Sequence, residues 1–158
     1  MYSDQTNMKC LSVSQPFADL IIQGKKTIEL RTWNTRFRGE FLVHAPLKVR
    51  IKTCKKLGID LENIRTGVII GRVEIYDVKV YRSSSELKSD YDKHFAGKEF
   101  LNHKYGFLLR NPKEFRVPIP HKGSLGFFEV KLNPKINLNE IKTELFDEEQ
   151  RYQWVGKH

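Results

Sequence analysis

The stretch LSVSQPFADLIIQGKKTIELRTWNTRFR, residues 11–38, contains the change of periodicity that decides the fold. Its first half places Phe17, Leu20 and Ile21 at helical spacing, which gives one buried face. Ser14 is a suitable N-cap and Pro16 suits the first helical turn. Gly24 follows the last apolar residue and is expected to end the helix in the left-handed conformation.

From Thr27 onward the hydrophobic period changes to two, which predicts a strand over residues 27–33. Ile28 and Leu30 share one face of this strand, and Glu29 and Arg31 share the other, together with Thr27 and Trp33. The strand would therefore bury its aliphatic residues and present a carboxylate beside a guanidinium group. Strict alternation turns Lys26 toward the side of Ile28, whereas loop geometry can turn it toward Glu29, and the pattern leaves both orientations open.

The rest of the chain consists mainly of expected strands with helices between them. Strands are expected at 39–45, 67–81, 104–109, 114–118 and 127–132, a basic helix at 47–57 and a polar helix at 83–95. The hydrophobic phase changes near Asp77, which predicts a bulge or bend. Asn111-Pro112 is expected to separate two strands. These elements predict an α+β fold centred on a small, mainly antiparallel β-barrel.

Length and hydrophobicity indicate one domain with a terminal extension. The 158 residues are 39% hydrophobic, enough for one compact core. Residues 1–9 are expected to form a loose leader and residues 10–132 the domain. Residues 133–158 are expected to form a helical extension, with an apolar stripe that packs on the domain. That extension is also a candidate surface for a protein partner.

Composition excludes several classes of protein. Cys10 and Cys54 lie far apart with no nearby histidine pattern, so we expect neither a disulfide framework nor a metal site. No apolar run approaches the roughly 20 residues of a membrane span, and the polar N-terminus does not resemble a signal peptide. The motifs of phosphate-binding loops and nucleophilic hydrolases do not occur. We therefore expect a cytoplasmic protein without a cofactor.

The charge of the chain is strongly positive and unevenly distributed. Lys and Arg number 28 against 19 Asp and Glu, which gives a net charge of +9. Residues 1–136 contain 25 basic and 14 acidic side chains, whereas residues 137–158 contain 3 and 5. A basic body indicates a polyanionic partner, most simply a nucleic acid, or a protein that only uses its charge for solubility.

Two segments combine residue types that could bind a ligand. On the pattern alone, Lys26, Glu29 and Arg31 favour a surface ion pair; in a partly dry pocket they could bind phosphate or transfer protons. The segment 33–38, WNTRFR, alternates aromatic and basic residues. It could stack on bases, or simply cover one end of the barrel. The basic residues of 48–56 favour a solvated helix face over a phosphate-binding one.

The order of three segments resembles the ASCH (activating signal cointegrator homology) domain family. These segments are LSVSQPFADLIIQGKKTIELRTWNTRFRGEFLVHA (11–45), GVIIGRVEIYDV (67–78) and KYGFLLRNPKEFRVPIPHKGSLGFFEV (104–130). The resemblance covers about residues 8–131. It implies a PUA-like β-barrel and a cleft lined by the Gln-Pro dipeptide and the G-x-K-x-x-E-x-R residues. It also implies binding of RNA or single-stranded nucleic acid.

A second branch of the same family implies a different activity. Its members are small amidohydrolases that remove the acetyl group from N4-acetylcytidine, with a Lys and a Thr in the G-x-K-x-x-T-x-R turn and a Glu on a later helix. Lys26 matches the Lys, but Glu29 occupies the position of the Thr, and Glu86 is the candidate for the later Glu. Because the proposed nucleophile is absent, this activity is not transferred to the chain.

The preferred interpretation is therefore a nucleic-acid-binding domain, with RNA, single-stranded nucleic acid or a nucleoside as its ligand. In this interpretation Gln15 and Glu29 read the edges of a base, and Trp33 or Tyr105 stacks on it. The other expected ligand-binding residues are Lys26, Thr27, Arg31, Arg36, Arg38 and Lys122. The alternative is a hydrolase acting on a modified nucleoside or on RNA, with Lys26 and Glu29 as candidate catalytic acid and base.

Overall fold

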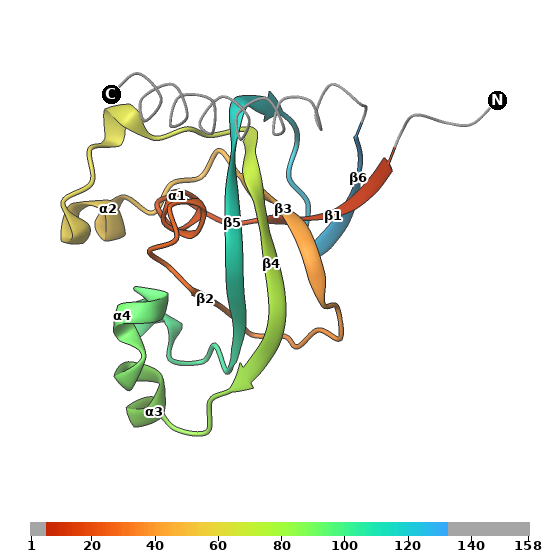
Figure 1. Cartoon of the computed structure of the whole chain (residues 1–158). Helices are drawn as coiled ribbons and strands as arrows, with labels where there is room; N and C mark the ends of the chain where they lie inside the picture. The colour runs from red at the N-terminus through yellow and green to blue at the C-terminus, as the bar shows by residue number, and fades with distance from the viewer. Residues whose placement is uncertain (1–5, 133–158) are drawn as a thin grey trace, which may run out of the picture.

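The structure, a computed structural model, describes residues 6–132 (Figure 1). Six strands form one mixed sheet in the order β2-β5-β4-β3-β1-β6. The strands are β1 (Thr6–Ser12), β2 (Ile28–Arg31), β3 (Gly39–Ala45), β4 (Val68–Val80), β5 (Tyr105–Pro120) and β6 (Phe127–Leu132). Among these strands, only β1 and β3 pair in parallel; the other neighbours are antiparallel. The expected extension at 133–158 lies outside the described residues.

The expected closure of the strands into a barrel is not confirmed. The two strands at the ends of the sheet, β2 and β6, have no pairing with each other among residues 6–132. Aromatic rings lie close to β6 instead. Trp33 packs edge-on against Phe107 of β5 and Phe127 of β6, and Phe37 also packs against Phe127. We conclude that the segment after β2 contacts β6 through packed aromatic rings and not through strand pairing.

The helices are short, and α1 packs most closely on the sheet. They are α1 (Phe17–Ile22), α2 (Ile51–Leu57), α3 (Ser84–Ser89) and α4 (Tyr91–His94), with 3-10 turns at Leu61–Asn63 and Lys98–Phe100. Figure 1 shows α1 beside β5, and contacts of α1 with β3, β4 and β5 confirm this placement. No helix within the described residues is long and apolar enough to cross a membrane.

Alternation along the strands produces two separate apolar clusters. Leu11 of β1 and Val43 of β3 belong to the larger cluster, which also contains the buried face of α1. Cys10 and Leu42, one position earlier on the same strands, belong to a second cluster on the opposite face. Because neighbouring residues of a strand point to opposite sides, β1 and β3 bury both faces of the sheet.

The start of α1 differs from the expectation, whereas its end agrees with it. The helix begins at Phe17, and Ser14 does not act as an N-cap. The Ser14 hydroxyl instead accepts a hydrogen bond from Arg50 Nε at 2.7 Å. The side-chain oxygen of Gln15 accepts a hydrogen bond from the backbone N–H of Asp19 at 3.0 Å. Gly24 follows the helix with φ +79°, as predicted.

Further boundaries differ from the sequence-based expectations. The helix expected at 47–57 begins only at Ile51, and the strand expected at 27–33 is the shorter β2. Strand β1 already begins at Thr6, so residues 6–9 are not a loose leader. The two strands expected on either side of Asn111-Pro112 are one strand, β5. Asn111 takes φ 55°, and a register shift in the pairing with β4 accommodates this irregularity, so that pairing continues on both sides of it. The polar helix expected at 83–95 is divided into α3 and α4. The bulge predicted near Asp77 is confirmed by a register shift after Ile75.

Candidate functional site

A tight turn after α1 directs Lys26 into the protein. The backbone N–H groups of Lys25 and Lys26 both donate to the carbonyl of Leu20, which folds the chain back at the end of the helix. Lys26 Nζ then donates to the carbonyls of Ile28, at 2.7 Å, and His94, at 2.6 Å. Nζ also lies 3.3 Å from Glu29 Oε1. All three ammonium hydrogens therefore have an oxygen partner.

Glu29 links Lys26 to Arg31 through its two carboxylate oxygens. Oε2 accepts Nε of Arg31 at 2.9 Å and lies 2.8 Å from Nη2. Nη2 also donates to the carbonyl of Ser12 at 2.8 Å. The side chains of Lys26, Glu29 and Arg31 are 1%, 7% and 20% exposed. These residues are therefore a buried ion-pair cluster, not the surface ion pair that the pattern alone favoured.

The charges of the cluster support one another despite their burial. Burial lowers the pKa of Lys26 to about 8, although the Glu29 carboxylate opposes this shift. Burial alone would raise the pKa of Glu29, but the charges of Arg31 and Lys26 and their hydrogen bonds outweigh it, so this pKa is lowered. At neutral pH the cluster therefore contains two cations and one anion. The contacts of Arg31 with Glu29 and Ser12 use Nε and Nη2, which leaves Nη1 as the guanidinium nitrogen for a ligand.

The cluster lies at the side of a cleft of about 260 Å³. The polar and aromatic residues that line it are Ser12, Ser14, Phe17, Lys26, Glu29, Arg31, Lys48, Arg50, Phe100 and His103. Lys48 and Arg50 precede α2, and this segment is held in place by the Arg50 N–H, which donates to the Gln15 carbonyl. The Arg50 guanidinium lies 4.6 Å above the ring of Phe100. The cleft thus combines a basic rim with aromatic walls.

His103 adds a neutral imidazole to the cleft. Burial lowers its pKa; the charges of Arg50 and Arg31 lower it further, and Glu29 opposes them. The ring packs on Phe100 with the ring centroids 4.9 Å apart. Because a bound anion would favour the protonated ring, His103 is a group whose charge can respond to a ligand. No three His, Cys, Asp or Glu side chains of residues 6–132 gather closely enough to hold a metal ion.

Of the ten expected ligand-binding residues, Lys26, Glu29 and Arg31 line this cleft together. Gln15 does not line it. The Gln15 side chain is fully buried between the N–H of Asp19 and the carbonyl of Arg65, which it contacts at 3.0 Å each. Its hydrogen-bonding groups therefore stabilise the start of α1.

The remaining expected residues also lie outside the lining of the cleft. Trp33 packs into the aromatic cluster beside β6, and Arg38 forms an ion pair with Asp77 at 3.6 Å. Thr27, Arg36 and Lys122 are exposed, and Tyr105 pairs with Arg31 across β5 and β2. Glu86 accepts the N–H of Arg82 and takes part in the start of α3. A role of these residues in ligand binding stays a prediction.

Sequence reasoning missed several residues of the cleft. Ser12, Ser14, Phe100 and His103 carry no motif that would mark them, and they come from distant parts of the chain. Lys48 and Arg50 belong to the basic segment 48–56, whose pattern favours a solvated helix face. Within the described residues, the bridge between Gln15 and Val49 brings that segment to the cleft.

The comparison with protein families identifies the class of protein to which this fold and cleft belong. The model of the ASCH domain matches residues 11–131, so the chain is a member of the ASCH domain family. The fold is similar to the crystal structure of ASCH from Zymomonas mobilis, with a TM-score of 0.54 and 17% identity over 85% of this chain and 93% of that chain. A mutant form of the same Zymomonas mobilis protein gives a TM-score of 0.56 at 17% identity, over 85% of this chain and 94% of the other.

Two curated relatives match in sequence. Activating signal cointegrator 1 of Homo sapiens and that of Mus musculus are each 29% identical over 140 residues. The match covers 81% of this chain and 23% of each relative. The chain thus spans about a quarter of the length of these relatives, and the likeness concerns their matched portion.

Proposed function

We propose that the protein binds RNA or another single-stranded nucleic acid and holds one nucleotide in the cleft beside Arg31. The observation that carries this proposal is the buried cluster, which fixes Arg31 through Nε and Nη2 while Lys48 and Arg50 add positive charge at the rim. A site with net positive charge and low exposure attracts a phosphate group more strongly than scattered surface lysines do. Membership of the ASCH family is compatible with this ligand class.

Each residue of the cleft has a distinct role in this proposal. Arg31 and Lys48 contact phosphate oxygens, because guanidinium and ammonium groups form charge-assisted hydrogen bonds with them. Arg50 is exposed, and its planar guanidinium, which already packs on Phe100, is a group on which a base can stack. Ser14 accepts a hydrogen bond from Arg50, which leaves the hydroxyl hydrogen for a polar edge of the base. Lys26 and Glu29 act as positioning residues for Arg31.

Fluorescence anisotropy with a labelled single-stranded RNA tests the proposal. We expect binding that weakens steeply as salt rises, because each phosphate contact releases counterions. Lys48→Glu and Arg50→Ala should each weaken binding about tenfold or more. Lys55→Glu is the matched control, since Lys55 is exposed on α2 but does not line the cleft. Equal affinities for Lys48→Glu and Lys55→Glu would contradict the proposal.

The alternative, a hydrolase acting on a modified nucleoside or on RNA, is favoured by one observation. Burial brings the pKa of Lys26 to about 8, close to the range suited to proton transfer. However, the three ammonium hydrogens of Lys26 are bound to oxygens, and the side chain is almost completely buried. A substrate would have to displace these bonds before it could exchange a proton with Lys26. Binding is therefore the function that the contacts of the cleft support best.

Mass spectrometry separates the two functions. Acetylated cytidine and a short RNA would be incubated with the wild-type chain and with Lys26→Met. Turnover by the wild type that Lys26→Met abolishes, in a variant whose circular dichroism spectrum is unchanged, would establish the hydrolase. Oligonucleotide binding without turnover of either substrate is the result that our proposal predicts.

A further inference from the structure

A groove of about 690 Å³ runs beside the cleft, along α2. It shares Ser14, Lys48 and Arg50 with the cleft, so the two hollows adjoin each other. A third hollow of about 250 Å³ shares Lys56, Gly97 and Lys98 with the groove. The three hollows therefore follow one another along the surface, from the ion-pair cluster along α2 to α4.

Four lysines contribute most of the positive charge of this groove and of the third hollow. Lys48, Lys52, Lys56 and Lys98 line the groove or the third hollow, and none forms an ion pair with a carboxylate of residues 6–132. Elsewhere the acidic residues are used in pairs, such as Arg65 with Asp19, Arg72 with Glu40 and Arg110 with Glu74. Within the described part of the chain, Glu99 is the single carboxylate in the lining of the groove. The lining of the groove therefore contains several lysines that no carboxylate of residues 6–132 pairs with, and one carboxylate.

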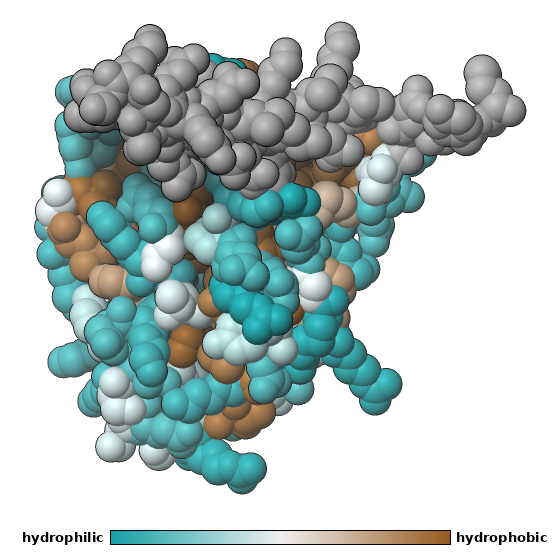
Figure 2. Space-filling view, in the orientation of Figure 1, coloured by the Kyte–Doolittle hydropathy of each residue, from teal (hydrophilic) through white to brown (hydrophobic). Residues whose placement is uncertain are grey.

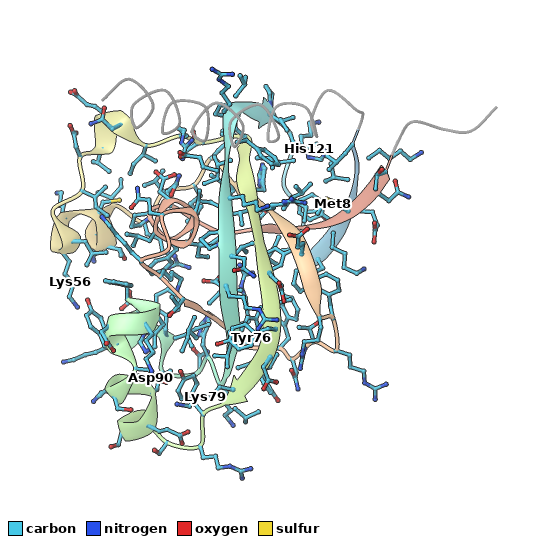
Figure 3. All side chains as sticks on the ribbon, in the orientation of Figure 1. Met8, Lys56, Tyr76, Lys79, Asp90 and His121 are labelled. Carbon is cyan, nitrogen blue, oxygen red and sulfur yellow. The ribbon has the colours of Figure 1, made fainter. Side chains whose placement is uncertain are left out.

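The floor of the groove is apolar. Val49, Ile51 and Phe95 contribute to its lining, and Ile51 is 51% exposed although it belongs to α2. In the region of α2, Figure 2 shows apolar residues interspersed with hydrophilic ones. At the far end, Lys56 extends from α2 toward α4 (Figure 3), where its Nζ lies 5.1 Å from the centroid of the Tyr91 ring. The groove therefore alternates charge with surfaces on which flat rings can rest.

We infer that a single-stranded nucleic acid leaves the nucleotide cleft along this groove, with successive phosphates beside Lys48, Lys52 and Lys56 and its bases against the apolar floor. This inference rests on the proposed function and extends it from one nucleotide to several. Lys52 and Lys56 are one helical turn apart, about 6 Å along the axis, so both can follow one strand. A cationic groove with aromatic and apolar surfaces is the arrangement by which proteins bind single strands without reading their sequence.

A length series of oligonucleotides tests the inference with the full chain. Labelled oligouridylates of 2, 4, 8 and 12 nucleotides would be titrated by anisotropy at several salt concentrations. We expect affinity to rise with length until the groove is filled. Lys52→Glu and Lys56→Glu should each weaken binding of the 12-mer about tenfold and leave the dinucleotide unchanged. Because each phosphate contact contributes about −0.7 to the slope of log K against log salt, each variant should flatten this slope for the 12-mer by about that amount.

Lys55→Glu controls for charge, because it makes the same change on the same helix at a residue that does not line the groove. If Lys55→Glu weakens the 12-mer as strongly as Lys52→Glu, the inference is overturned, while dinucleotide binding that depends on Arg50 still supports the nucleotide cleft. If the wild type binds no oligonucleotide, the proposed function itself fails. A polyglutamate peptide that displaces the 12-mer as effectively as unlabelled oligouridylate would assign the groove to acidic peptides instead.

Discussion

Replacing Glu29 by Gln should destabilise the protein in a way that depends on pH. The substitution keeps the shape of the side chain but removes the charge that faces Lys26 and Arg31. With a pKa of about 8, Lys26 can lose its proton at pH 7 at a cost of about 1.4 kcal/mol, which limits its share of the penalty. Arg31 cannot lose its proton, so it stays charged, and the loss of its charged hydrogen bonds lowers the free energy of unfolding by about 1.5–3 kcal/mol. We expect a total loss of about 3–4 kcal/mol at pH 7.

The pH dependence follows from the direction of each shift. Without Glu29, the pKa of Lys26 in the folded variant falls below 8, so the unfolded chain holds more protons and stability rises with pH. The difference between the variant and the wild type should therefore shrink by about 1 kcal/mol from pH 7 to pH 8, because the wild type itself loses half of the Lys26 proton by pH 8. On the acid side, the pKa of Glu29 is lowered in the folded wild type. Its contribution is present above about 4.5 and is lost as pH falls through the folded value, so the difference shrinks there too.

Urea unfolding followed by circular dichroism at pH 4 to 9 measures this difference. Glu74→Gln is a matched control, because Glu74 Oε2 also accepts Nε and Nη2 of one arginine, Arg110, at 2.9 and 2.7 Å, but at the surface. We expect the control to have a small effect that does not change between pH 6 and pH 8. If Glu29→Gln matched the control in both size and pH dependence, the electrostatic account of the cluster would be wrong.

Three further predictions concern other parts of the structure. Gly71→Ala should lower the free energy of unfolding in urea by about 3 kcal/mol or more, since its Cβ would overlap the backbone carbonyl of Lys113. Gly58→Ala is the control: the space around it is open, and its positive φ alone should lower the free energy of unfolding by about 1–2 kcal/mol. Gln15→Leu leaves a buried N–H and a carbonyl without partners and should cost about 2–4 kcal/mol, while affinity for RNA of the folded protein changes little. Asp90→Asn should lower stability above pH 4, because Lys79 and Tyr81 hold the pKa of this carboxyl below its usual value. The loss of stability should shrink in acid, and equal melting temperatures of the variant and the wild type at pH 7 would refute this.

Local periodicity was sufficient to predict part of the site. Alternation alone placed Glu29 and Arg31 on one face and Ile28 and Leu30 on the other, and both placements are confirmed. The orientation of Lys26 was not accessible from the sequence, because it depends on the carbonyl of His94, which is 68 residues away. A partner at such a distance in the chain leaves no local pattern.

The sheet was predicted more accurately in its strands than in its closure. Hydrophobic alternation identifies a strand wherever one face is buried, but it does not say which strands become neighbours. The parallel pairing of β1 with β3 and the ring contacts of Trp33 with β6 depend on contacts between distant segments. Gln15 shows the same limit in the site, since the motif marked it for a ligand and its amide is used by the backbone instead.

The ion-pair cluster is better explained by positioning than by stability. A buried ion pair seldom stabilises a protein more than apolar residues of the same volume would, because its charges lose their hydration. The cluster fixes the orientation of Arg31. Glu29 and the Ser12 carbonyl accept hydrogen bonds from its Nε and Nη2, so the long side chain is ordered without a ligand. A free arginine side chain carries about 2 kcal/mol of rotamer entropy, and ordering it in advance leaves more of the binding energy for the complex. Lys26 in turn holds Glu29, so the almost fully buried lysine at the turn after α1 fits the proposed role of the cleft in binding.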